Sequence, residues 1–96
     1  MKILDFIPVG RENAMTAKAI TQTMELAHER DFTKAVEIAR GQGVAICADT
    51  HHGYWLPEDR DELDQYTKSL RSRKNSVERT LAGAETALAR WPDDRI

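Results

Sequence analysis

The feature that most restricts the fold is the stretch from Glu58 to Trp91, which follows Pro57 and contains no proline. Its one helix-weakening residue is Gly83, which costs about 1 kcal/mol relative to alanine. At about 1.5 Å per residue, such a helix is a rod of about 50 Å. The residues before it can bury only a small core, so we expect the far half of the rod to need a partner.

Hydrophobic residues recur along this stretch in a heptad pattern, which is weak before Val77 because the alternate positions there are Thr67 and Lys74. A heptad seam predicts coiled-coil-like packing and hence a homodimer, parallel or antiparallel. The residues expected to make the dimer contact are Leu70, Val77, Leu81, Ala84, Leu88 and Trp91.

Two amphipathic helices are predicted in the first half, after a short apolar helix or turn at residues 3–7. Thr16 is a suitable N-cap for the first, whose apolar face would include Ile20, Met24 and Ala27. A turn at residues 26–28 leads to the second helix.

That second helix is expected from about Glu29 to Gly41. Phe32, Val36 and Ala39 lie at helical spacing and should face the core. Its opposite face would then carry mainly charged side chains.

The residues after Gly43 change to β-type composition. Residues 44–48 and 54–56 read as short strands around a turn at residues 49–53, and Pro57 ends the second strand. Of the adjacent aromatics Tyr54 and Trp55, one should enter the core, because successive side chains of a strand point to opposite faces. The predicted class is therefore α+β: a short helix, two further helices, a β-hairpin and a long C-terminal helix.

This order of elements resembles a winged helix-turn-helix. The stretch from Asn13 to Pro57, especially GVAICADTHHGYWLP, resembles the winged DNA-binding domains of the biotin-repressor type. The whole chain is also similar to small phage and prophage DNA-binding proteins of Gram-positive bacteria. The resemblance implies double-stranded DNA as the partner, with the second helix in the major groove and the hairpin as the wing.

The residues that we expect to contact DNA lie mostly on the outward face of the second helix and at the tip of the hairpin. A net charge of −2 is unfavourable for phosphate binding, but a local basic stripe can still set the potential at the contact. The candidates for bases and groove edges are Arg30, Thr33, Lys34 and Glu37, and those for the DNA backbone include Arg40, His51, His52 and Lys18.

The basic run at residues 68–79 is open to two interpretations. It could lie along the duplex and contact phosphates, or it could face solvent or pair with the acidic run 58–64 of a second, antiparallel chain. The second interpretation is the one that long charged helices favour.

The sequence does not favour an enzyme, a metal site or a cofactor. His51 and His52 are adjacent on a loop, with no paired ligand spacing. Cys47 lies within a predicted strand without a base that could activate it, and a single cysteine fits a reducing cytoplasm. No apolar run is long enough to span a membrane, and no small-molecule substrate is evident.

We therefore expect a winged helix-turn-helix domain over residues 1–57, a dimerising helix over 58–92 and a disordered tail over 93–96. The expected function is sequence-specific DNA binding by a homodimer, as a phage-type transcriptional regulator or an accessory replication factor. The alternative is a protein–protein interaction adaptor that uses the same module without nucleic acid.

Overall fold

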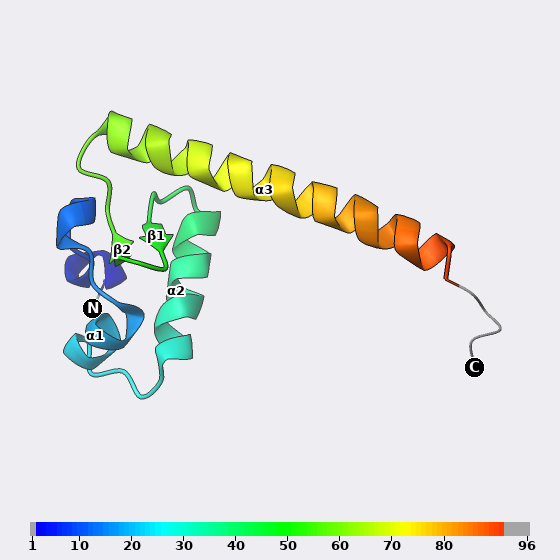
Figure 1. The fold of residues 1–96 in the computed structure, drawn as a ribbon. Helices are drawn as coiled ribbons and strands as arrows, with labels where there is room; N and C mark the ends of the chain where they lie inside the picture. The colour runs from blue at the N-terminus through cyan, green and yellow to red at the C-terminus, as the bar shows by residue number, and fades with distance from the viewer. Residues whose placement is uncertain (1, 92–96) are drawn as a thin grey trace. The chain divides into compact units, whose positions relative to one another are not determined.

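The structure is a computed structural model that describes residues 2–91, so the expected tail at 93–96 lies outside the described residues. Over these residues the protein is α+β, as predicted, with three α-helices and a two-stranded antiparallel hairpin (Figure 1). In chain order its elements are two 3-10 helices, η1 (Ile3–Phe6) and η2 (Arg11–Asn13), then α1 (Ala17–Thr23), α2 (Glu29–Gly41), β1 (Cys47–Asp49), β2 (Gly53–Trp55) and α3 (Arg60–Ala89).

The chain divides into two compact units between Gln65 and Tyr66, inside α3. We call the first the globular unit and the second the helical unit. Sequence reasoning placed the boundary at Pro57, but the first turns of α3 belong to the globular unit. Within that unit the backbone N–H of Arg11 donates to Oε1 of Glu62 over 3.0 Å, which ties the start of α3 to η2.

Helix α1 begins where the sequence predicted and ends earlier. The Thr16 hydroxyl accepts a hydrogen bond from the N–H of Ala19, which confirms Thr16 as the N-cap. The helix stops at Thr23, so Met24 and Ala27 lie beyond it, in the connection to α2.

The end of α1 is a Schellman turn built on a residue other than glycine. Glu25 adopts a left-handed conformation with φ of 58°. Its N–H donates to the carbonyl of Gln22, and the N–H of Leu26 donates to that of Thr21. Because these two bonds satisfy carbonyls at the helix end, the chain reverses sharply there and α2 packs against α1.

Helix α2 has the predicted bounds, and its inward face is the predicted one. Phe32 is fully buried, and Val36 and Ala39 are buried beside it. The ring of Tyr54 meets Phe32 edge to face at a centroid distance of 4.9 Å, so the hairpin and α2 share one core. The buried residues of this core are Ile7, Ile20, Phe32, Val36, Ala39 and Ile46.

The hairpin is shorter than predicted because other bonds occupy the residues beside it. Strands β1 and β2 pair Cys47 with Trp55 at one end and Asp49 with Gly53 at the other. Ile46 lies before β1, and its carbonyl accepts from the Arg40 side chain instead of entering the strand ladder.

The second strand is held from its other side by the N-terminal segment. Met15 and Tyr54 exchange backbone hydrogen bonds of 3.0 and 2.7 Å, and Val9 bridges to Leu56. Gly53 sits at φ of 100°, and a Cβ there would lie 2.3 Å from the carbonyl oxygen of Met15. Only glycine fits this approach of two backbones.

Helix α3 is a continuous helix of 30 residues. None of those residues, all within the described part of the chain, is buried. Gly83 does not interrupt it, and a Cβ there would meet nothing within 4 Å.

Candidate nucleic-acid interface

The outward face of α2 presents the side chains that sequence reasoning chose for DNA contact. Arg30, Thr33, Lys34 and Glu37 are all exposed, whereas the opposite face of the same helix is buried. Arg30 and Lys34 lie one turn apart, close enough to act on one ligand. The Thr33 hydroxyl donates to the carbonyl of Arg30 over 3.2 Å, which leaves its oxygen able to accept.

Arg40, the last basic residue of α2, is engaged by the fold. Its Nε and Nη2 donate to the Ile46 carbonyl oxygen over 2.9 and 2.8 Å. This charge-assisted fork links the end of α2 to the start of the hairpin. Arg40 therefore positions the hairpin relative to α2, in addition to any role toward a ligand.

The hairpin tip is organised by Asp49. The backbone N–H groups of His51 and His52 donate to Asp49 Oδ1, and Nδ1 of His52 lies 2.9 Å from Oδ2. Burial raises the pKa of Asp49, but these hydrogen bonds outweigh it, so the pKa lies below the ordinary 3.8. The tip is consequently a preformed turn in which the side chains of both histidines are exposed.

Arg11 is a residue that sequence reasoning missed. Its Nη2 forms an ion pair with Asp49 Oδ2 over 3.3 Å, and its guanidinium lies 5.9 Å from the centre of the Trp55 ring. The chain separates Arg11 from Asp49 by 38 residues, and a lone Arg in a short 3-10 helix gives no spacing signal for such a contact.

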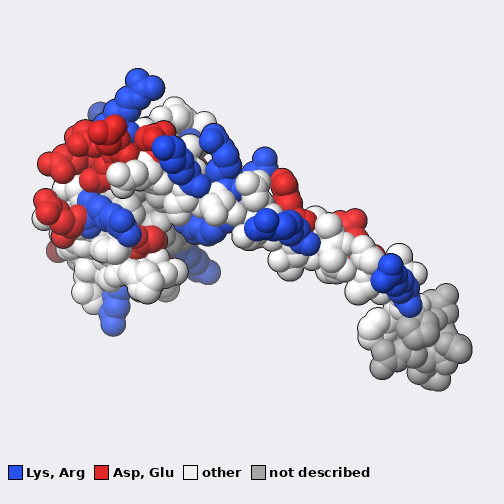
Figure 2. All heavy atoms as spheres, turned by 45° about the horizontal axis from the view of Figure 1, so that its top comes forward, with Lys and Arg blue, Asp and Glu red and all other residues white. Residues whose placement is uncertain are grey.

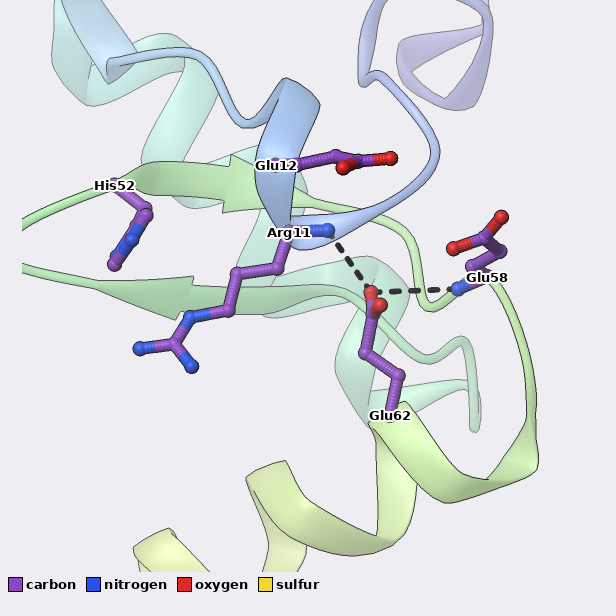
Figure 3. Close-up of a pocket in the computed structure, with 5 residues that line it drawn as sticks. All are labelled: Arg11, Glu12, His52, Glu58 and Glu62. Atoms are coloured by element: carbon purple, nitrogen blue, oxygen red, sulfur yellow. Dashed lines mark hydrogen bonds between the residues drawn. The ribbon is translucent and has the colours of Figure 1, made fainter.

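A charged hollow lies beside the hairpin, lined by residues of η2, the hairpin tip and the start of α3 (Figure 3). The Glu62 carboxylate accepts there from the backbone N–H groups of Arg11 and Glu58, over 3.0 and 3.4 Å. The Arg11 side chain extends toward His52, whereas the Glu12 side chain points away from it (Figure 3). The bonds of Arg11 and Glu62 join η2, the hairpin and the start of α3 around this hollow.

Cys47 is buried in β1. Burial, reinforced by the nearby Glu62 carboxylate and opposed by Arg40, raises the pKa of the Cys47 thiol to about 11. A thiol with this pKa is a poor nucleophile at neutral pH. Among residues 2–91 there is also no group of three or more His, Cys, Asp or Glu side chains placed to hold a metal ion.

Charge is distributed unevenly over the surface, as Figure 2 shows. Acidic side chains gather on one area of the globular unit, and basic side chains are spaced along the helix. In the helical unit Lys74 pairs with Glu78 over 3.7 Å, one turn away, and both side chains are mostly exposed. Lys18, on α1, is exposed as well.

The residues expected to form the dimer contact lie on α3 or directly after it, and all are exposed. The exposed fraction is 42% for Leu70 and 74% for Leu88, with Val77, Leu81 and Trp91 between these values. Ala84 is also exposed.

No protein-family model matches the chain, and neither a curated protein nor a solved structure shows significant similarity to it. Within residues 2–91, no helix combines the length and apolar character needed to cross a membrane.

Proposed function

We propose that the protein binds double-stranded DNA sequence-specifically, with α2 as the helix that enters the major groove. The observation that carries the proposal is the division of α2 into two faces. Phe32 and Val36 anchor the helix in the core, and Arg30 and Lys34 are exposed on the other side. Such a helix can present several side chains to base edges without disturbing its own packing.

The surroundings of α2 support a winged helix-turn-helix assignment. A tight turn joins α1 to α2, and a hairpin follows α2, the order that the sequence resemblance implies. In this assignment the hairpin is the wing, and His51 and His52 at its tip contact phosphates together with Lys18. Asp49 holds the tip in one conformation, which reduces the entropy lost on binding.

The charges on α2 balance one another. On α2 itself, Glu29, Asp31 and Glu37 offset the three basic residues. We therefore expect a single chain to bind DNA with moderate affinity. Glu37 would contribute by discriminating between bases rather than by attracting the duplex. A homodimer held by α3 would double the phosphate contacts and match a two-fold operator. The biological role would be that of a phage-type transcriptional regulator or accessory replication factor in the cytoplasm.

The test is titration of the full chain with a random-sequence duplex pool at low and moderate salt, followed by selection of the tightest site. We expect binding that weakens as salt rises, because counterions are released from the phosphates. Arg30→Ala combined with Lys34→Ala should weaken binding at least tenfold, given about 1–3 kcal/mol for each specific contact. Arg60→Ala, an exposed arginine at the start of α3, is the matched control and should bind as the wild type does. Undetectable binding at low salt contradicts the proposal.

A protein–protein interaction adaptor is the second candidate, and the mixed charge on α2 favours it. In that case the outward face of α2 would complement a protein surface with charges of both signs. A protein partner that protects α2 from amide exchange, together with no response to duplex DNA, would favour the adaptor.

A further inference from the structure

A stripe of large apolar side chains runs along α3 and is exposed to solvent. Leu70, Val77, Leu81 and Leu88 are between 42% and 74% exposed. From Leu70 onward they recur at the alternating spacing of a heptad, with Lys74 and Ala84 filling the two positions between them. A stripe with this period on one continuous helix is suited to pairing with a second helix.

Some of the charged side chains beside the stripe have an oppositely charged partner on the same helix, and others do not. Lys74 has Glu78 one turn away, at 3.7 Å. Arg71 and Glu85 also flank the stripe and are exposed. At three and four residues from Arg71 and from Glu85, positions that all lie in the described helix, no side chain of opposite charge occurs. Each of these two charges therefore lacks an intrahelical partner of the kind that Lys74 has.

We infer that α3 pairs with α3 of a second copy in antiparallel orientation, with Arg71 of each copy facing Glu85 of the other. This inference specifies the homodimer of the proposed function. In this register the seam places Val77 opposite Leu81, and Leu70 opposite Leu88. The complementary charges at both ends of the contact set the orientation.

Lys74 is the residue that discriminates against a parallel pair. In parallel, Lys74 would face Lys74 of the second copy inside the seam, and Ala84 would face Ala84 and leave a gap. In the antiparallel register Lys74 faces Ala84, so its aliphatic stem covers the small side chain and its amine reaches solvent.

A shift of one heptad in the antiparallel pair is less favourable. It would bring Asp64 of each copy against Glu85 of the other, and these two acid pairs offset the pairs that Arg71 would make with Glu78. The register with Arg71 facing Glu85 has a single acid pair, Glu78 against Glu78 at its centre. The shift would also require Leu63, which is already half-buried in the globular unit, to serve the seam. The register with Arg71 facing Glu85 uses only residues after Gln65.

The experiment is a charge exchange, read by sedimentation equilibrium of the full chain. The wild type should be a dimer, and Arg71→Glu should weaken dimerisation roughly tenfold, because two surface ion pairs become repulsive. Arg71→Glu combined with Glu85→Arg should restore dimerisation, whereas Arg71→Glu combined with Glu78→Arg should not. A monomeric wild type overturns the inference, and so does a double variant Arg71→Glu/Glu85→Arg that stays as weak as Arg71→Glu.

A distance measurement checks the orientation without altering the charges. A spin label on Gln65→Cys should be separated from its copy by roughly 40 Å along an antiparallel pair, against roughly 20 Å for a parallel one. Cys47 can stay in place because its buried thiol has a pKa of about 11, and the wild type should take up no label. The shorter distance overturns the antiparallel pairing.

Failure here is distinguishable from failure of DNA binding. If the chain is a monomer but Arg30→Ala with Lys34→Ala still weakens duplex binding, only the inference on α3 is lost. If the charge-exchange variants dimerise as expected but no binding to duplex DNA is detected, the antiparallel dimer is supported and the DNA-binding proposal is contradicted.

Discussion

The globular unit and the helical unit obtain their structure in different ways. In the globular unit, residues distant in the chain share a core around Phe32, and backbone bonds join Met15 to β2. In the described part of the helical unit, residues 66–91, every side chain other than that of Tyr66 is exposed. The comparison indicates that the first unit is stabilised by a core within one chain, whereas the described part of the second has helix propensity alone unless the proposed pairing between chains adds to it.

The two units should differ most in the stability that is lost when a large apolar side chain is deleted from each. Phe32→Ala should lower the free energy of unfolding by about 3–5 kcal/mol, because the fully buried ring leaves a cavity. Leu81→Ala removes a side chain that is 55% exposed and should leave the unfolding of the globular unit unchanged. Urea unfolding followed by Trp55 fluorescence measures both, and equal losses would remove the distinction between the units.

Replacing one glycine in each unit by alanine should change stability in opposite directions. Gly53→Ala should destabilise by about 3 kcal/mol, because its Cβ would overlap the Met15 carbonyl and its φ is positive. Gly83→Ala should raise the thermal stability of α3 by up to about 1 kcal/mol, because an added methyl meets nothing there. Circular dichroism melts of the two variants test this, and a stable Gly53→Ala would mean that β2 does not approach Met15 as described.

A smaller gain in stability should come from replacing one buried polar group inside the globular unit. The Thr21 hydroxyl is buried, and among the described residues no hydrogen-bond partner for it is found. Thr21→Val keeps the shape and removes the unsatisfied group, so it should stabilise by about 1 kcal/mol, whereas Thr21→Ser should not. Chemical denaturation at one pH compares the two, and a destabilised Thr21→Val would show that the hydroxyl is satisfied in solution.

The smallest effect should be the pH dependence contributed by the hairpin tip. Because the folded pKa of Asp49 lies below 3.8, its contribution to stability is present above that value and is lost as the pH falls through the folded pKa. Asp49→Asn should therefore lose less stability between pH 6 and pH 2.5 than the wild type does. Asp61→Asn, exposed in the first turn of α3, is the control and should keep the wild-type dependence. Identical profiles for wild type and Asp49→Asn would contradict the proposed role of the tip hydrogen bonds.

The parts of the fold that local patterning controls were predictable. The spacing of Phe32, Val36 and Ala39 was sufficient to place α2 and its inward face, and the cap at Thr16 followed from its residue type. The left-handed end of α1 was not predictable, because Glu25 occupies a position where glycine is the usual signal.

Contacts between segments distant in the chain account for the other features that the sequence did not predict. The strands are shorter than predicted because the carbonyl of Ile46 bonds to Arg40 and the backbone of Leu56 bonds to Pro8 and Gly10. Of the candidate site, the exposure of Arg30 and Lys34 was predictable from the helical period. The tie from Arg11 to Asp49 was not, since neither residue belongs to a recognisable spacing pattern.

The central claim is that the outward face of α2 meets duplex DNA, and the most direct measurement is a map of backbone amide signals during titration with the selected duplex. The account predicts that the largest shifts fall on residues 29–41, with smaller shifts at His51 and His52. Shifts confined to other parts of the chain, or no shift at saturating duplex in low salt, would contradict it.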